Sequence, residues 1–253
     1  MTAAPDSPGL TLTGERTVPG QLRENYWFRR HEAAYAWLIE QFPPAGGTLV
    51  DAGSGEGYGA QMLRDAGASR VIALEYDESA AAHAALAYPM VRTVRANLDA
   101  LPLPDRSIDM LVTMQVVEHL WDLPRFLREC RRVLRPGGLI AAATPNRPTF
   151  SPGLGRGERP ANPFHVEEFD AEQVAQMLSG AGFADVRVWG VHHGPRIAPD
   201  IVARQIAAVL EDAWTPDLLA EVGAVTSGDF VVDAVDPGAG LDLIGVGRAP
   251  GAS

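Results

Sequence analysis

The chain has 253 residues, of which 46% are hydrophobic and 21% are charged, a balance typical of an ordinary soluble protein. Its 21 basic and 32 acidic side chains give a net charge of −11, which argues against nucleic acid or an anionic membrane as the main partner. A single cysteine excludes an internal disulfide, and no apolar run reaches the length of a membrane span. These features predict a cytoplasmic protein.

The N-terminus is expected to be a flexible tail over residues 1–20. It is rich in proline, glycine and serine and has neither the basic nor the apolar region of a signal peptide. Residues 21–253 are expected to form a single domain. The domain begins with a helix over 22–42, where aromatic and aliphatic side chains recur at helical spacing until Pro43 and Pro44 end it.

Apolar strands and helical segments alternate from residue 48 onward. The strands are expected at 48–51, 70–75, 90–95, 109–115, 138–144, 183–190 and 241–248, and the helices at 57–66, 78–87, 123–134 and 171–181. This order predicts an α/β fold of the Rossmann-like type, with a seven-stranded, mostly parallel sheet and helices on both faces. Residues 194–240, with helical patterns at 201–214 and 217–222, are expected to be a helical insertion before the last strand. It would serve as a lid, a substrate wall or an oligomer contact.

The first strand breaks into a glycine-rich turn that reads T-L-V-D-A-G-S-G-E-G-Y-G over 48–59. Glycine permits positive φ and lets a ligand approach bare main chain, while the N-terminus of the following helix offers free N–H groups to an anionic group. Glu75 closes the next strand 20 residues after Gly55, where a ribose-binding carboxylate is expected in a nucleotide-binding βαβ unit. The chain is therefore predicted to bind an adenosine-containing cofactor.

Two kinds of cofactor compete for this turn. The spacing of Gly55, Gly57 and Ala60 satisfies a dinucleotide fingerprint, which would suit a nicotinamide-dependent oxidoreductase. Asp51 favours S-adenosylmethionine instead, because an acid at this place can receive the cationic amino group of methionine but would lie badly against a pyrophosphate. The oxidoreductase is therefore the weaker alternative.

Further motifs follow in order along the chain: A-N-L-D-A-L-P-L-P-D-R-S-I-D-M-L-V at 96–112, M-Q-V-V-E-H-L-W-D at 114–122 and R-V-L-R-P-G-G-L at 132–139. With these motifs the chain resembles a class I S-adenosylmethionine-dependent methyltransferase over residues 48–190. The resemblance implies that the cofactor is bound by Asp51, Ala52, Gly53, Ser54, Gly55, Gly57, Tyr58, Glu75, Tyr76, Asn97, Leu98 and Gln115. Asn97 departs from the aspartate that the family often has, but an amide can still accept a hydrogen bond from the adenine amino group.

Five shorter segments concern the methyl acceptor: G-E-R-T-V-P at 14–19, E-N-Y-W-F-R-R-H at 24–31, N-P-F-H at 162–165, H-G-P-R at 193–196 and L-D-L-I at 241–244. In them the chain resembles actinobacterial sugar O-methyltransferases of methylglucose lipopolysaccharide and methylmannose polysaccharide synthesis. The resemblance implies methylation of a hexose hydroxyl, with the 6-OH of glucose as the leading acceptor. The residues then expected to bind the acceptor are Tyr26, Trp27, Arg30, Asn146, Asn162, His193 and Arg196.

Methyl transfer from a sulfonium to a sugar hydroxyl calls for a general base, because the hydroxyl is a weak nucleophile. Histidine is the usual choice near neutral pH. We favour His165, in a loop after the fifth strand, slightly over His119, which follows Glu118 just past the fourth strand. Glu118 could orient the imidazole as the acid of a catalytic triad does. The plainer alternatives are an ordering role for the Glu118–His119 pair and a loop hydrogen bond from His165 to Glu167 or Glu168.

A divalent metal such as Mg²⁺ is another way to acidify the hydroxyl. Its ligands could come from Glu118, His119, Asp122 and His165, but their spacing is not specific for a metal, so the sequence favours a mechanism without one.

Two other functions stay open: methylation of a phenol, quinone or lipid precursor, and cofactor binding without catalysis. The expected partner is a small-molecule or saccharide acceptor, without nucleic acid or membrane insertion, and the sequence leaves a homodimer open.

Overall fold

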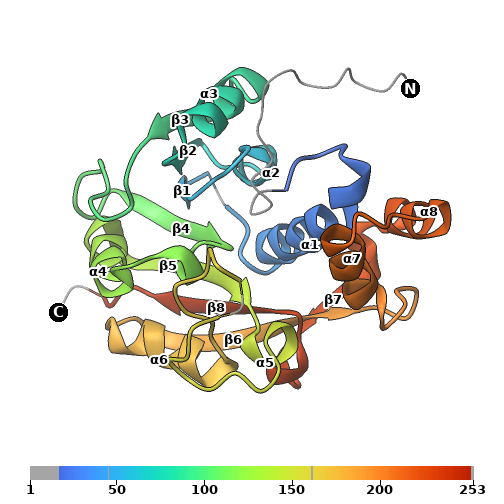
Figure 1. Cartoon of the computed structure of the whole chain (residues 1–253). Helices are drawn as coiled ribbons and strands as arrows, with labels where there is room; N and C mark the ends of the chain where they lie inside the picture. Colours follow the sequence, from blue (N-terminus) through green and yellow to red (C-terminus); the bar gives the residue numbers. More distant parts are fainter. Residues whose placement is uncertain (1–16, 45, 161, 252–253) are drawn as a thin grey trace.

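The sheet of the computed structural model, which describes residues 17–44, 46–160 and 162–251, has eight strands in the order β3-β2-β1-β4-β5-β8-β6-β7 (Figure 1). The strands are β1 (Thr48–Ala52), β2 (Arg70–Glu75), β3 (Arg92–Arg95), β4 (Ile108–Met114), β5 (Leu134–Pro145), β6 (Ala184–His193), β7 (Phe230–Asp233) and β8 (Asp242–Arg248). The five strands from β3 to β5 run parallel. β8 is antiparallel to both β5 and β6, and β7 is antiparallel to β6. The Rossmann-like α/β prediction is confirmed.

The predicted count of seven strands was wrong by one. The additional strand, β7, lies at the edge of the sheet beside β6 and belongs to the 194–240 segment. Val231 on this strand is 47% exposed, so β7 lacks the buried apolar run of β1, β2, β4 and β5. Its residues show no clear apolar alternation that would have predicted a strand within 194–240.

Helices cover both faces of the sheet. They are α1 (Asn25–Gln41), α2 (Tyr58–Asp65), α3 (Glu78–Ala87), α4 (Leu123–Val133), α5 (Arg147–Phe150), α6 (Ala171–Gly180), α7 (Ile201–Leu210) and α8 (Pro216–Ala224). Side chains alternate across β1, so Leu49 packs into the core under α1 and α2, whereas Val50 packs into the core under α4 and α6. These two cores fix the carboxyl edge of the parallel strands.

Acidic N-caps start several of the helices. Asp77 accepts a hydrogen bond from Ala80 N at the start of α3, and Asp122 accepts one from Arg125 N at the start of α4. Asp122, which the sequence analysis considered as a metal ligand, therefore has a structural partner.

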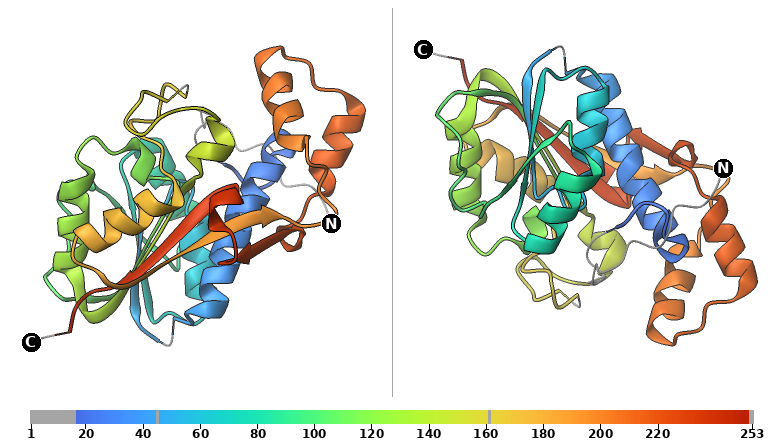
Figure 2. Two further views of the ribbon diagram at one scale, coloured as in Figure 1. Left: turned by 90° about the horizontal axis from the view of Figure 1, so that it is seen from below. Right: turned by 90° about the horizontal axis from the view of Figure 1, so that it is seen from above.

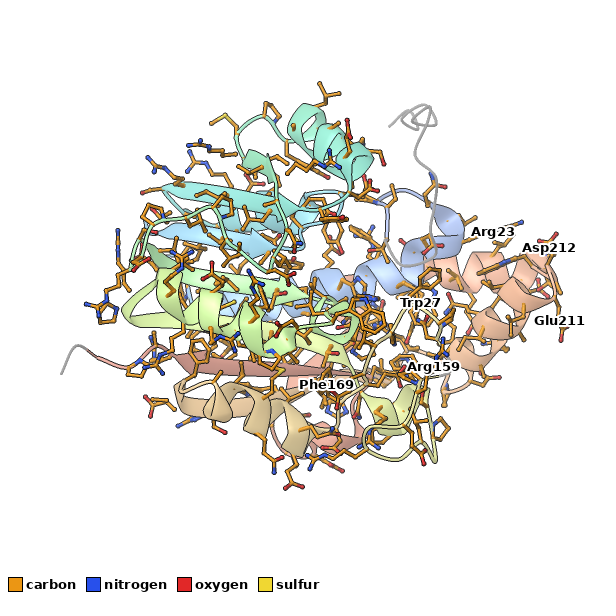
Figure 3. The ribbon with its side chains drawn as sticks, turned by 60° about the vertical axis from the view of Figure 1, so that its left-hand side comes forward. Arg23, Trp27, Arg159, Phe169, Glu211 and Asp212 are labelled. Atoms are coloured by element: carbon orange, nitrogen blue, oxygen red, sulfur yellow. The ribbon has the colours of Figure 1, made fainter. Side chains whose placement is uncertain are left out.

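The helices of the predicted insertion lie beside the N-terminal helix, and Ile201 and Leu218 share its hydrophobic core. α8 packs against the start of α1, where Asn25 Nδ2 donates to the carbonyls of Val222 and Val225, both at 2.9 Å. Arg23 Nη1 lies 3.8 Å from Asp212 Oδ1 across the same junction (Figure 3). α7 and α8 project outward on this side, beyond the edge of the sheet (Figure 2).

Candidate active site

The glycine-rich turn opens at the carboxyl edge of the sheet, directly after β1. Gly53 has a φ of +78°, and a Cβ added to it would lie 2.4 Å from Val116 Cγ2, so a side chain there would be both strained and crowded. Gly55 also has a positive φ, +51°, but a Cβ added to it would meet no atom within 4 Å. The main chain at Gly55 therefore borders open space that a ligand can occupy.

Glu75, at the end of β2, holds this turn in place. Its Oε2 accepts a hydrogen bond from Gly55 N at 2.8 Å, and its Oε1 accepts one from Asp77 N at 2.8 Å. The side chain is nevertheless within reach of a ligand, because it lines the same cavity as the turn. This is the place at which a ribose diol is expected in such a βαβ unit.

A cavity of about 730 Å³ lies at the carboxyl ends of β1, β2 and β4. Its lining contains most of the residues that the sequence assigned to the cofactor: Gly53, Ser54, Gly55, Tyr58, Glu75, Tyr76, Asn97, Leu98 and Gln115. Asp51, Ala52 and Gly57 are not among the lining residues. The sequence analysis did not anticipate Tyr35 and Trp121 in the lining. No described residue of 194–240 lines this cavity, so the insertion does not close over it here.

Asp51 is fully buried behind the cavity wall. The Tyr35 hydroxyl donates to it and lies 3.0 and 3.1 Å from its two carboxylate oxygens. Burial raises the pKa of the Asp51 carboxyl to about 7, although the Tyr35 hydrogen bond opposes this shift and the charge of Glu75 adds to it. A cationic group brought beside Asp51 would favour its ionised form. Tyr35 packs against Gly59, because a Cβ added to this glycine would lie 2.1 Å from Tyr35 Cζ.

The three residues predicted to be catalytic come together beside the cavity, and we call Glu118, His119 and His165 the Glu118 cluster. The short helix η2 (Val117–His119) carries the first two, and the loop before α6 carries the third. One ligand atom from each residue lies within 4.8 Å of the others, and the two imidazole centroids are 5.0 Å apart. The loop is tied to η2 because Val166 N donates to the Glu118 carbonyl at 2.7 Å. His119 also lines the cavity, so the cluster borders it.

Each imidazole of the cluster is oriented by an acceptor at Nδ1. His119 Nδ1 lies 3.0 Å from the carbonyl oxygen of Phe164, which can only accept, so Nδ1 carries the hydrogen. His165 Nδ1 lies 2.8 Å from Glu168 Oε1. Burial opposes ionisation of Glu168, but the hydrogen bond with His165 helps to hold the pKa of its carboxyl below the usual range. In both rings Nε2 is then the basic nitrogen.

Glu118 is the buried member of the cluster, with 1% of its surface exposed. Thr144 Oγ1 donates to its Oε2 at 3.0 Å, whereas its Oε1 has no hydrogen-bond partner. Burial raises the pKa of the Glu118 carboxyl to about 7, against the hydrogen bond of its own backbone, the charge of His165 and the Thr144 hydrogen bond. Glu118 Oε1 is therefore a buried acceptor that a cation or a hydrogen-bond donor would stabilise.

A buried ion pair joins the N-terminal helix to the last strand. Arg30 Nε lies 2.9 Å from Asp242 Oδ2, with both side chains almost fully buried. The rings of Trp27 and Phe150 lie 4.8 and 5.0 Å from the guanidinium carbon, at cation–π distance (Figure 3 labels Trp27). Asp242 was not predicted as a site residue. It could have been recognised as an acid inside the apolar L-D-L-I segment. A buried charge is rare without a partner, so such an acid indicates an ion pair.

Two further residues assigned to the acceptor lie beside this pair. Tyr26 is fully buried, and its hydroxyl lies 2.6 Å from His193 Nε2. Burial and the nearby charge of Arg30 lower the pKa of His193. Tyr26, Trp27, Arg30 and His193 are thus brought together, while Asn162 lies in the loop of the Glu118 cluster, with its Nδ2 donating to His165 Nε2 at 3.1 Å.

Two of the predicted acceptor residues have other partners. Asn146 is fully buried and donates through Nδ2 to the carbonyls of Gly238 and Gly240 at 2.8 and 2.7 Å, which fixes the turn before β8. Arg196 pairs with Asp229 at 2.5 Å on the insertion, with 73% of its side chain exposed. Neither is placed in the group around Arg30.

Within the described residues, no helix is both long and apolar enough to cross a membrane.

Known proteins resemble this chain along most of its length. A family described as a methyltransferase domain matches residues 50–142. A probable S-adenosylmethionine-dependent methyltransferase of Mycobacterium tuberculosis H37Rv is 46% identical, covering 95% of this chain and 90% of that protein. One of Mycolicibacterium smegmatis is 45% identical, covering 95% of this chain and 96% of that protein.

A solved structure supports the same assignment at the level of the fold. An S-adenosylmethionine-dependent methyltransferase from Thermotoga maritima matches with a TM-score of 0.61 at 19% identity, covering 88% of this chain and 92% of that one. The shared architecture, the cofactor cavity and the mycobacterial relatives agree: this chain belongs to the class I S-adenosylmethionine-dependent methyltransferases.

Proposed function

We propose that the enzyme transfers the methyl group of S-adenosylmethionine to a hexose hydroxyl of a saccharide, with the 6-OH of glucose in methylglucose lipopolysaccharide synthesis as the leading acceptor. The observation that carries this proposal is the Glu118 cluster, which places two imidazoles and a buried carboxylate at the border of the cofactor cavity. A hydroxyl that is a weak nucleophile needs such groups to remove its proton as it reacts.

His165 is the residue that we favour as the general base. Its Nδ1 is held by Glu168, so Nε2 can accept a proton, and the carboxylate stabilises the imidazolium that forms. Asn162 Nδ2, 3.1 Å from Nε2, occupies the position from which an acceptor hydroxyl would donate. The hydroxyl oxygen attacks the methyl carbon, its proton passes to Nε2, and the electron pair of the S–CH₃ bond stays on sulfur to give S-adenosylhomocysteine.

The buried polar group around Arg30, which reaches the cofactor cavity through Gln115, supports a saccharide over a phenol, quinone or lipid precursor. Asp242 pairs with Arg30 at 2.9 Å and also interacts with the side chain of Gln115, which lines the cofactor cavity, while Arg30 Nη1 has no hydrogen-bond partner. Buried polar atoms normally carry hydrogen bonds, and sugar hydroxyls can both donate and accept. Trp27 and Phe150 add aromatic faces next to these polar atoms, a combination that suits the apolar and polar sides of a hexose.

The acceptor class rests on these features and on the five sequence segments, since the two mycobacterial relatives are named only as probable methyltransferases. Release of S-adenosylhomocysteine should be measured with short α-glucans and methylmannosides, and with a phenol and a quinone precursor for comparison. Turnover with a glucan and a new O-methyl signal at C6 by NMR would support the proposal. Turnover with the phenol or the quinone precursor alone would contradict the saccharide proposal and favour that acceptor class. Cofactor binding without turnover on any acceptor would favour a binding protein.

A further inference from the structure

We propose that the Glu118 cluster binds a divalent transition-metal ion such as Mn²⁺, Co²⁺ or Zn²⁺, through Glu118 Oε1, His119 Nε2 and His165 Nε2. Metal binding itself does not depend on which acceptor the enzyme uses. The part that the ion plays in catalysis rests on the function proposed above.

The spacing of the three residues fits a single ion. One ligand atom from each lies within 4.8 Å of the others. Bonds of about 2.0–2.2 Å to one ion hold its ligand atoms within about 4.4 Å of one another. A small rotation of the side chains therefore completes the site.

The surroundings of both imidazoles are those of metal ligands. A histidine that binds a metal usually donates its other ring N–H to a backbone carbonyl or a carboxylate, which fixes the tautomer and aims the free nitrogen at the ion. His119 does so to the carbonyl of Phe164 at 3.0 Å, and His165 does so to Glu168 at 2.8 Å. The two imidazoles, with centroids 5.0 Å apart, are each held by an acceptor at Nδ1, which makes Nε2 the ligand atom of both.

Glu118 supplies the negative ligand. Its Oε2 is held by Thr144 at 3.0 Å, while its Oε1 is buried without a hydrogen-bond partner. An unpaired buried carboxylate oxygen is costly, and a cation beside it removes that cost. The ion can enter from the cofactor cavity, which His119 lines.

The ligand set selects the kind of metal. Two imidazoles and one carboxylate suit Zn²⁺ and the other first-row transition metals, whereas Mg²⁺ prefers oxygen ligands in an octahedron. Three protein ligands also leave coordination positions open for oxygens of an acceptor. The Mg²⁺ considered in the sequence analysis is therefore a poorer match than Mn²⁺, Co²⁺ or Zn²⁺.

With an ion bound, the cluster can activate the acceptor hydroxyl in a second way. An acceptor hydroxyl that coordinates the ion becomes more acidic. It releases its proton to water, the oxygen attacks the methyl carbon, and the S–CH₃ bonding pair stays on sulfur. His165 is then a ligand in place of a base, and the Asn162 amide is displaced from its Nε2.

The test is calorimetry on full-length protein that has been freed of metal with a chelator and dialysed, titrated with Mn²⁺, Zn²⁺ and, for comparison, Mg²⁺. We expect one equivalent of Mn²⁺ or Zn²⁺ to bind. Affinity should fall at least tenfold in Glu118→Gln, His119→Ala and His165→Ala. The matched control is His83→Ala, because His83 also contacts a buried carboxylate, Glu56 at 2.6 Å, but lies outside the cluster.

Two more variants separate a metal site from a polar network. Glu168→Gln should weaken binding roughly 10–100-fold, as is usual when a partner behind a histidine ligand is changed. Asn162→Ala should keep the affinity or raise it, since the ion replaces that amide. Calorimetry with S-adenosylmethionine checks that each variant is folded.

The outcomes distinguish this inference from the proposed function. Absence of stoichiometric binding, or equal binding in the three cluster variants and the His83 control, would overturn the metal site. Methylation of a saccharide by protein that binds no metal would leave the proposed function standing without it. Metal binding without methylation of any saccharide would keep the site and overturn the proposed function.

Discussion

The cofactor end and the acceptor end of the active site are built in different ways. The cofactor end draws mainly on the stretch from Asp51 to Gln115, which contains the glycine-rich turn, and α1 adds Tyr35. The acceptor end that we propose joins α1, η2, the loop around His165 and the start of β8, and it relies on side chains. The contrast teaches that a largely local motif can mark a nucleotide site, whereas the acceptor site that we propose depends on contacts between distant segments.

The largest expected effect is a loss of kcat that leaves cofactor affinity unchanged. His165→Ala should lower kcat about 10²–10⁴-fold, the usual contribution of a positioned acid–base group, and should leave the affinity for S-adenosylmethionine unchanged. Steady-state kinetics and calorimetry would measure both. A loss of cofactor affinity as large as the loss of kcat would mean that the two ends are not separable.

The next variant tests how much the acceptor end contributes to the fold. Asp242→Ala leaves the charge of Arg30 buried and unpaired, so we expect the free energy of unfolding to fall by about 3–5 kcal/mol. Glu78→Ala is the matched control, because Glu78 pairs with Arg95 at 2.9 Å on the surface. Exposed pairs contribute about 0–1 kcal/mol. Urea unfolding compares the two, and equal losses would contradict the assigned role of the buried pair.

At the cofactor end, two glycine variants separate backbone strain from crowding. Gly53→Ala and Gly67→Ala both place a side chain at positive φ, +78° and +103°. The positive φ should cost each variant roughly 1–2 kcal/mol of stability, and the contact with Val116 adds to the cost at Gly53. Only at Gly53 does the new Cβ meet Val116, so only Gly53→Ala should also weaken cofactor binding, by at least tenfold. Similar cofactor affinities in both variants would show that the turn tolerates the displacement.

The smallest effect is a dependence of cofactor affinity on pH. The pKa of Asp51 is raised to about 7, so its carboxyl is neutral below that pH and ionised above it. The ammonium group of S-adenosylmethionine favours the ionised form. Affinity should therefore fall by up to about tenfold, or about 1.4 kcal/mol, from pH 7 to pH 6. Calorimetry between pH 5.5 and 8.5 measures this slope, which Asp51→Asn should abolish.

Much of the cofactor end was predictable because its signals are local. The turn that follows β1 needs glycine at fixed places, and Glu75 follows at the distance that one βαβ unit imposes. The same periodic patterns placed α7 and α8 correctly within the insertion. β7 escaped because an exposed edge strand of four residues carries no clear alternation.

The acceptor end was predictable only in part, because its partners are far apart along the chain. Asp242 reaches Arg30 from β8, and the loop of His165 reaches η2 through the hydrogen bond from Val166 N to the Glu118 carbonyl. The sequence analysis weighed Glu168 as a loop partner of His165, without a catalytic meaning. The spacing of these residues carries no local rule, and only the folding of the sheet brings them together.

The position of β8 at the end of the chain also sets the order in which the two ends of the active site are synthesised. Ribosomes extend the chain from its N-terminus, so the strands of the cofactor end emerge well before Asp242, which opens the last strand of the sheet. Because β8 lies between β5 and β6, the sheet stays open in its interior until this last strand has been made. The domain therefore has to complete its folding as a unit after nearly the whole chain has been synthesised.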